Sequence, residues 1–287
     1  MQQTVRAGEY PAAMPPGSPL VALDIDGTIV HHDGHLSPRV ARAIQDLADS
    51  QATVMIATGR SVLATMPVLH ELGLVRNGWY AVCSNGAVTL ALDPGTDDGY
   101  RLHRVVTFDP APAVRILQRL LPHAIVAVED VGVGFKVNRL FPEPDLAERQ
   151  TVVTLDELVS EPVPRVTFRD VSERPRDFST MLDGIGLHGV NYAIGFSSWL
   201  DLAPEGVSKA SGLEAVREAL GVDAAHTVAV GDQRNDIEML QWAARGVAMG
   251  QAPPEVMAVA DEVTADVVGD GLALVLEDLL TRVGRVA

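Results

Sequence analysis

The chain contains 287 residues, of which 38 are acidic and 22 basic, so its formal net charge at pH 7 is −16. Because no basic cluster offsets this charge, the composition argues against binding to nucleic acids or anionic membranes. No apolar run approaches the ~20 residues that a membrane-spanning helix needs. Cys83 is the single cysteine, which excludes an intramolecular disulfide. We therefore expect a cytoplasmic protein that contacts neither nucleic acid nor membrane.

The first 19 residues are rich in proline and have few periodic apolar positions, which predicts a disordered leader. Apolar strands then alternate with helices over residues 20–88, and the alternation returns over 204–287. The expected strands are 20–24, 52–57, 80–84, 227–231 and 246–249. Helices are expected from Ser37 with Pro38 as the first residue, from Ser61, over 209–220 and 236–243, and from about Leu272. This alternation predicts an α/β fold with a parallel sheet.

Residues 89–203 have a different pattern of elements, in which several strand-like runs follow one another with few helices between them. The expected strands are 105–108, 125–128, 134–137, 165–168 and 192–196, and the expected helices are 113–121, 156–160 and 177–183. A chain of this length commonly forms two domains. We therefore predict an inserted α+β domain with an antiparallel sheet inside the α/β core.

Two carboxylates, Asp24 and Asp26, stand at the end of the first expected strand, followed by Gly27 and Thr28. Residues i and i+2 of an extended segment point to the same side, so the two acids would face one site. Their repulsion is unfavourable unless a cation or a proton intervenes. Taken alone, the motif could also be an ordinary exit from a strand into a turn.

Three further sites lie at comparable places. Thr58 and Gly59 follow the second expected strand and precede a helix, a position suited to phosphate. Lys209 begins a helical pattern, and a third strand ends in a segment with two more acids and an amide, Asp232, Asn235 and Asp236. Each could be a helix cap, a surface charge or a turn residue. Because ligands of an open parallel sheet bind at the carboxyl ends of its strands, the four sites would converge on one crevice.

The order and content of these motifs resemble the haloacid dehalogenase-like phosphohydrolases. An Asn-Gly pair after the third strand, Asn85 and Gly86, is typical of their Cof-type branch. The resemblance covers nearly the whole chain after the leader. It implies a Rossmann-like parallel-sheet core with an inserted α+β cap that reads the leaving group. Ala210 departs from the pattern, because Gly is usual after the lysine, and we expect only a slightly changed backbone there.

The resemblance also implies roles for the matching residues. Asp24 would be the nucleophile that forms an aspartyl-phosphate, and Asp26 the general acid and base. Mg²⁺ would be held by Asp24, the main-chain carbonyl of Asp26, and Asp232. The phosphate would be bound by a set that spans all the motifs: Thr58, Gly59, Lys209 and Asn235. Asp236 would orient Lys209 or a metal-bound water from outside the ligand set.

Lys136 is a candidate for contacting substrate from the inserted domain, as is Asn85 from the core. Only Lys136 and Lys209 are lysines among the 22 basic residues, so a lysine could mark a place where a compact, flexible charge is needed. A chance surface lysine is the alternative reading. The arginines of the same domain, at 165, 169, 174 and 176, alternate with acids, which is typical of surface ion pairs.

Three functions agree with the sequence. The first is Mg²⁺-dependent hydrolysis of a small phosphorylated metabolite, such as a sugar phosphate or a nucleotide-like cofactor, by a monomer or homodimer. The second is phosphoryl transfer to another alcohol by a phosphotransferase or mutase of the same superfamily. The third is an inactive protein that binds a ligand through the cap. The adjacent acids Asp24 and Asp26 count against this third function, because their repulsion has no evident use without catalysis.

Overall fold

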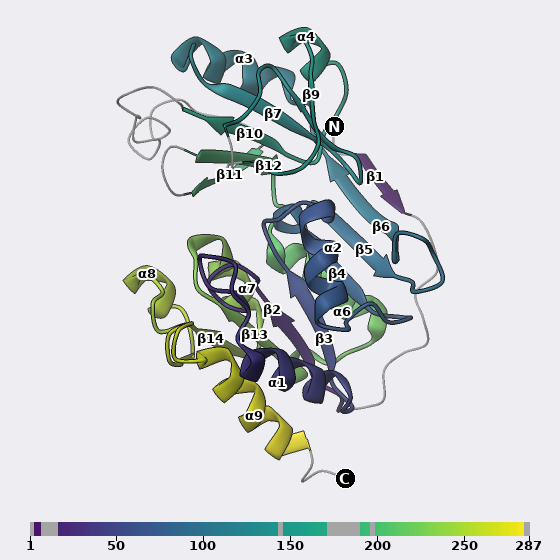
Figure 1. The fold of residues 1–287 in the computed structure, drawn as a ribbon, viewed down its shortest axis with the longest axis vertical. Coiled ribbons are helices and arrows are strands. Elements are labelled where there is room, and N and C mark those ends of the chain that lie inside the picture. The colour runs from purple at the N-terminus through teal and green to yellow at the C-terminus, as the bar shows by residue number, and fades with distance from the viewer. Residues whose placement is uncertain (1–2, 7–16, 143–145, 171–189, 196–198, 284–287) are drawn as a thin grey trace.

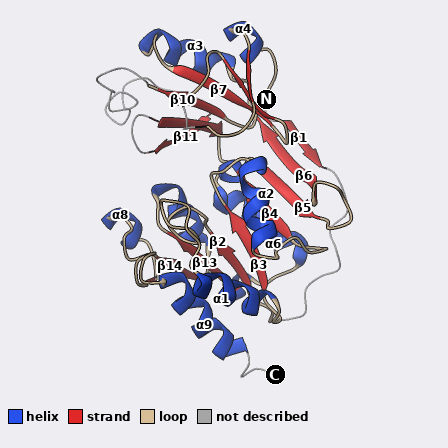
Figure 2. Cartoon of the chain, viewed as in Figure 1, coloured by secondary structure: helices blue, strands red, loops and turns tan. Residues whose placement is uncertain are grey.

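The structure is a computed structural model that describes residues 3–6, 17–142, 146–170, 190–195 and 199–283. Two sheets form two domains, which lie one above the other in Figure 1. The helices and strands of both domains are distinguished in Figure 2. The predicted α/β core with an inserted α+β cap is confirmed.

The core sheet has nine strands in the order β1-β6-β5-β4-β3-β2-β13-β14-β15. The strands from β4 to β15 in this order run parallel, and β5, β6 and β1 add an antiparallel edge. Their bounds are β1 (Gln3–Arg6), β2 (Leu20–Leu23), β3 (Thr53–Ala57), β4 (Tyr80–Cys83), β5 (Val88–Leu92), β6 (Tyr100–Thr107), β13 (Thr227–Gly231), β14 (Arg245–Ala248) and β15 (Glu262–Val263).

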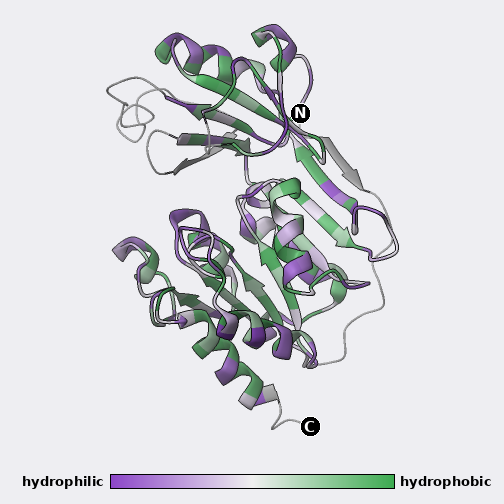
Figure 3. Cartoon of the chain, in the orientation of Figure 1, coloured by the Kyte–Doolittle hydropathy of each residue, from purple (hydrophilic) through white to green (hydrophobic). Residues whose placement is uncertain are grey.

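Helices cover both faces of the parallel part of this sheet. They are α1 (Pro38–Ala48), α2 (Val62–Glu71), α6 (Lys209–Leu220), α7 (Ile237–Trp242), α8 (Pro254–Met257) and α9 (Gly271–Val283). In β2, Val21 and Leu23 pack in one apolar cluster with α1, α2 and α9, while Leu20 and Ala22 pack in another with α6 and α7. Burial on both faces explains why the central strands are almost uniformly apolar in sequence, as the green strands in Figure 3 show.

The cap sheet has six strands in the order β11-β12-β10-β7-β8-β9. The cap elements are α3 (Ala111–Leu120), β7 (Ile125–Asp130), β8 (Gly134–Val137), β9 (Gln150–Val152), α4 (Leu155–Leu158), β10 (Val166–Arg169), β11 (Val190–Gly195) and β12 (Trp199–Pro204). Helices α3 and α4 pack on the face of the sheet that carries Val126, Val128 and Phe168. In Figure 1 this helical layer lies on the side away from the core, so the opposite face of the sheet is turned toward the core.

Two predicted boundaries were wrong. Residues 3–6 of the predicted leader form β1, which pairs with β6 through main-chain hydrogen bonds and so needs no apolar pattern. Strands β5 and β6 extend the core sheet instead of starting the cap at residue 89, because the short turn after β4 returns the chain antiparallel beside it. The predicted strand at 105–108 therefore belongs largely to the core. The predicted helix at 177–183 lies outside the described residues.

Within the described residues, no helix is long and apolar enough to cross a membrane.

Candidate active site

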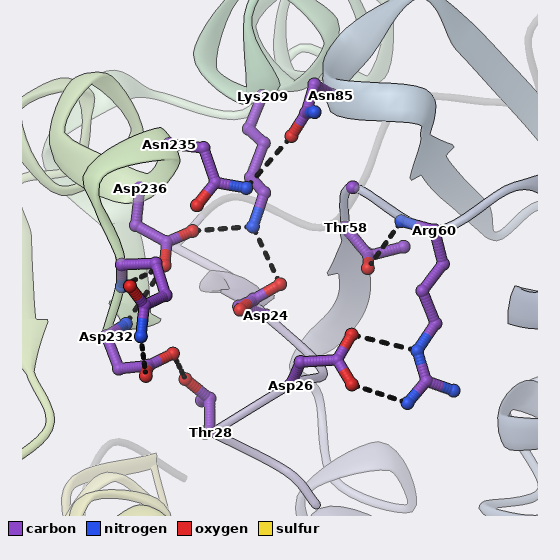
Figure 4. Close-up of polar contacts among 12 residues, drawn as sticks. Asp24, Asp26, Thr28, Thr58, Arg60, Asn85, Lys209, Asp232, Asn235 and Asp236 are labelled. Atoms are coloured by element: carbon purple, nitrogen blue, oxygen red, sulfur yellow. Dashed lines mark hydrogen bonds and ion pairs between the residues drawn. The ribbon is translucent and has the colours of Figure 1, made fainter. Parts of the chain in front are cut away.

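Asp24 and Lys209 form a buried ion pair at the carboxyl edge of the core sheet (Figure 4). Asp24 directly follows β2, and its main-chain N–H donates to the Val230 carbonyl of the neighbouring strand at 3.1 Å. Lys209 is the first residue of α6, whose N-cap is Ser208. The Lys209 ammonium donates to Oδ1 of Asp24 and to Oδ1 of Asp236, both at 2.6 Å. The strand and the helix therefore hold this contact across 185 residues of sequence.

Burial and neighbouring charges shift the pKa values of Asp24 and Lys209. Burial, followed by the charge of Asp236, raises the pKa of Asp24 well above its usual value, and Lys209 only partly offsets this rise. Burial alone would lower the pKa of Lys209, but the charges of Asp236 and Asp24 outweigh it and raise that pKa. The lysine therefore stays protonated. Its single positive charge does not balance the acids around it, so a further cation would stabilise their ionised form.

Asp232 and Asp236 have different surroundings, although both are fully buried. Both oxygens of the Asp236 carboxylate accept hydrogen bonds, because Oδ1 binds Lys209 and Oδ2 accepts the main-chain N–H groups of Asp232 and Gln233 at 2.9 Å each. Asp232 has weaker support, from Gln233 Nε2 at 3.0 Å and the Thr28 hydroxyl at 3.5 Å. Burial and the charge of Asp236 raise the pKa of Asp232 to about 6.

These acids fit a hard divalent cation. Asp24, Asp232 and Asp236 each offer an oxygen atom within 4.8 Å of the others. Within the described part of the chain, Asp236 is held by Lys209 and two main-chain N–H groups, whereas Asp232 accepts only from neutral side chains and Asp24 accepts only through Oδ1. Asp24 and Asp232 are therefore the better candidates for ligands, and a cation would offset the burial of their charge. Gly27 leaves the room that Asp232 occupies, because a Cβ atom there would lie 2.3 Å from Asp232 Oδ2.

Asp26 pairs with Arg60 and not with Lys209. The guanidinium donates to the two carboxylate oxygens, from Nε at 2.9 Å and from Nη2 at 2.6 Å. The Asp26 side chain is 57% exposed, in contrast to the buried Asp24. Arg60 was overlooked as a site residue, although it directly follows Gly59 in the motif. Nothing in the sequence shows that its side chain reaches an acid 34 residues earlier.

Three of the predicted phosphate-binding residues, Thr58, Gly59 and Asn235, lie beside Asn85, the predicted substrate contact that follows β4. The Asn235 amide donates to Asn85 Oδ1 at 2.9 Å, and a Cβ atom on Gly59 would lie 3.2 Å from the same oxygen. Thr58 is fully buried, and its hydroxyl oxygen accepts the main-chain N–H of Arg60 at 3.1 Å. Figure 4 shows Asn85, Asn235 and Thr58 around the Asp24–Lys209 pair. The structure thus brings together the motif residues from four separate segments.

The structure contradicts the predicted role of Lys136. Its neighbours in β8, Phe135 and Val137, belong to an apolar cluster on the face turned toward the core. Since side chains alternate along a strand, Lys136 points to the opposite face, away from the catalytic motifs. Sequence alone gives no register for this strand.

Arg165 differs from the predicted surface ion pairs. It is 7% exposed and pairs with the buried Glu129 of β7 at 3.1 Å. Of the other arginines in that group, those at 174 and 176 lie outside the described residues.

A family model of the haloacid dehalogenase-like hydrolases matches residues 21–276 of this chain. The chain belongs to the haloacid dehalogenase-like hydrolases. The prediction of this family and of its Cof-type branch is confirmed, and with it the prediction of a phosphatase.

Relatives within this family align over nearly their full length. The 5-amino-6-(5-phospho-D-ribitylamino)uracil phosphatase YitU of Bacillus subtilis is 28% identical, over 90% of this chain and 96% of the relative. A phosphoglycolate phosphatase of Halorubrum lacusprofundi is 30% identical, over 92% of this chain and 98% of the relative. The structure of BT1666, a phosphatase of the superfamily from Bacteroides thetaiotaomicron, is similar with a TM-score of 0.72 and 28% identity, over 91% of this chain and 94% of the other.

Proposed function

We propose that this phosphatase is a Mg²⁺-dependent phosphomonoesterase that acts on a small phosphorylated metabolite through an aspartyl-phosphate on Asp24. The observation that carries the proposal is the buried Asp24 carboxylate, whose Oδ1 is held by Lys209 at 2.6 Å beside Asp232. Among the described residues, no donor contacts Oδ2 of Asp24, which leaves that oxygen for attack on phosphorus.

Two steps account for hydrolysis. In the first, Asp24 forms a bond to phosphorus, the ester P–O bond breaks, and Asp26 gives a proton to the departing alcohol. In the second, water attacks the same phosphorus, its proton goes to Asp26, and the Asp24 carboxylate is released together with inorganic phosphate. The structure shows the ionised form of Asp26, the form that accepts the proton from water, with both carboxylate oxygens accepting from Arg60.

The remaining residues bind and balance charge. Lys209 and the Thr58 hydroxyl would bind non-bridging phosphate oxygens, with Asn235 and Asn85 beside them. Asp24, Asp232 and the main-chain carbonyl of Asp26 would hold Mg²⁺, which would neutralise the phosphate charge that faces the acids. Phosphoryl transfer depends mainly on such positioning and charge compensation.

The substrate class is a small phosphorylated metabolite, a sugar phosphate or a nucleotide-like cofactor. The phosphoribityl compound in the name of YitU and the phosphoglycolate in that of the Halorubrum lacusprofundi relative are both small phosphate monoesters with different leaving groups. A shared phosphate site with a variable cap accounts for this difference. We also propose a cytoplasmic monomer or homodimer, as the sequence predicts.

Release of inorganic phosphate from a panel of phosphomonoesters, with and without Mg²⁺, tests this proposal. We expect turnover that requires Mg²⁺ and is lost in Asp24→Asn. Asp46→Asn, the same change at an exposed residue of α1, is the matched control and should keep native turnover. Metal-independent hydrolysis, or hydrolysis that survives in Asp24→Asn, would refute the proposal. Transfer of the phosphoryl group to an added alcohol in preference to water would favour the phosphotransferase alternative.

A further inference from the structure

Two buried, charged residues of the cap contact the loops that carry the predicted phosphate-binding residues. Glu129 lies in β7 and Arg165 directly precedes β10, and each is less than a tenth exposed. Arg165 Nε lies 3.1 Å from Glu129 Oε2. The main-chain N–H of Glu129 also donates to the Arg165 carbonyl at 3.2 Å. A buried ion pair often adds little to the stability of a protein. We therefore consider what the contacts of this pair with the core do.

Arg165 fixes one peptide group of the loop after β3. Its Nη1 donates to the Gly59 carbonyl at 2.5 Å. In a trans peptide unit, the carbonyl of one residue and the N–H of the next point in opposite directions. Holding the Gly59 carbonyl therefore also fixes the direction of the Arg60 N–H, which donates to the Thr58 hydroxyl oxygen at 3.1 Å.

This chain of contacts determines what the Thr58 hydroxyl can do. A hydroxyl has one proton to donate and accepts through its oxygen. Because the oxygen of Thr58 already accepts from Arg60, the hydroxyl proton is available for an anionic acceptor. Arg165 thus orients a buried donor without touching the phosphate site itself.

Glu129 supports the neighbouring loop after β4. Its Oε2 accepts the hydroxyl of Ser84 at 2.7 Å. Ser84 and Asn85 have φ angles of 50° and 52°, a left-handed conformation that is unfavourable for residues other than glycine. The main-chain N–H of Asn85 then donates to the Thr58 carbonyl at 3.0 Å, which joins the two loops. One buried pair of the cap thereby contacts both loops.

We propose that Glu129 and Arg165 are positioning residues that hold Thr58 and Asn85 in the geometry that binds phosphate. They act through the Gly59 carbonyl and the Ser84 hydroxyl. The inference rests on the proposed phosphate-binding role of Thr58. It assigns to the cap a part in phosphate binding in addition to contact with the leaving group.

The double variant Glu129→Gln/Arg165→Met tests the proposal. It removes both charges at once, so no unpaired charge remains buried. We expect kcat to fall ~10-fold and the Kd of inorganic phosphate, measured by calorimetry in the presence of Mg²⁺, to rise by a similar factor, because one positioned donor commonly contributes 10-fold or more. Ser84→Ala removes a single hydroxyl and should raise the same Kd by a smaller factor of ~3. If the double variant does not fold, Ser84→Ala decides.

Two controls separate positioning from a general role of the cap. Arg139→Met makes the same arginine change at an exposed position of the cap. Glu148→Ala removes another bond between cap and core, from the Ser61 hydroxyl to Glu148 Oε1 at 2.7 Å, which does not involve the Gly59 peptide. Arg139→Met should keep native kcat and phosphate affinity. Glu148→Ala should lose less of either than the double variant, because the Glu148 carboxylate only adds to the charge around Arg60 and Arg165.

The outcomes are distinguishable from failure of the proposed function. A native protein without Mg²⁺-dependent phosphate binding or hydrolysis would refute the proposed function itself. An active native protein whose folded double variant, or whose Ser84→Ala variant, keeps native phosphate affinity would overturn this inference alone. An equal loss in Glu148→Ala would also overturn it, because the effect would then belong to any contact between cap and core.

Discussion

Asp232 is a buried acid with no direct cationic partner among the described side chains, and burial, followed by the charge of Asp236, raises its pKa from 3.8 to about 6. A raised carboxyl pKa means that the folded state binds the proton more tightly than the unfolded state. The resulting stability is fully present below pH 3.8 and is lost as the pH rises through about 6. The difference between these pKa values corresponds to about 3 kcal/mol.

We therefore expect the free energy of unfolding of the metal-free protein to fall between about pH 4 and pH 6, with a shallower slope in Asp232→Asn. Mg²⁺ should stabilise the native protein more at pH 7.5 than at pH 5, because only the ionised carboxylate is a ligand. Urea unfolding with and without Mg²⁺ measures both effects. Equal slopes in the two proteins would contradict the raised pKa of Asp232, and equal stabilisation by Mg²⁺ at the two pH values would contradict its assignment as a metal ligand.

Arg60 donates to both oxygens of Asp26, the proposed general acid and base. Arg60→Met should lower kcat by ~10-fold because Asp26 loses its orientation, while the Kd of inorganic phosphate stays near that of the native protein. Steady-state kinetics and calorimetry supply the two values. Arg39→Met is a matched control, since Arg39 donates in the same way to both oxygens of Glu277 in α9, at 2.9 and 2.7 Å. A native kcat in Arg60→Met would refute this role.

At the scale of elements, the first turn of α6 is placed by the loop after β4. Gly86 has a φ angle of 99°, and a Cβ atom there would lie 2.0 Å from the Ser208 carbonyl oxygen. Gly86 therefore lets the loop approach Ser208, the N-cap residue of α6. The position of Ser208 determines where Lys209 begins the helix.

Gly86→Ala should accordingly displace α6 and lower the free energy of unfolding by ~2 kcal/mol or more, together with phosphate affinity. Denaturant unfolding and calorimetry are the measurements. Gly73→Ala is the control, because Gly73 also has a positive φ of 66° but has no atom within 4 Å of an added Cβ. If both variants lose the same stability, backbone strain alone explains the loss, and the close approach to α6 has no separate effect.

The elements of the core were predictable because their signals are local. Ser37 and Pro38 begin α1 as predicted, and Ser61 caps α2. The strand at 227–231 has the predicted bounds. Strand β5 and its pairing with β4 were not predicted, because pairing partners depend on tertiary contacts. The same limit explains Lys136, whose direction depends on which face of β8 is turned toward the core.

The site was predictable to a similar extent. Asp24, Thr58 and Asp232 each follow an expected strand of a parallel sheet. The sequence alone therefore predicted that they lie at one edge of the sheet. The ion pairs of Arg60 and Arg165 were not predicted, since both join residues that are remote in sequence. Long, flexible side chains have no periodicity that reveals their partners.

In the whole molecule, the core holds the acids, Lys209 and the proposed phosphate-binding residues, and the cap contacts the loops beside them. Relatives with different named substrates align over 90% and 92% of the chain, which includes both domains. The net charge of −16 repels anionic substrates at long range. In the proposed mechanism, local positive charge from Lys209 and Mg²⁺ would therefore have to attract the phosphate.

The most direct test of this account is the mass of the protein after acid quench during turnover of a hydrolysed ester with Mg²⁺. We expect a phosphorylated species whose modified peptide contains Asp24 and which is absent in Asp24→Asn. Rapid hydrolysis without any phosphorylated species, or with phosphate on another residue, would contradict the central role of Asp24.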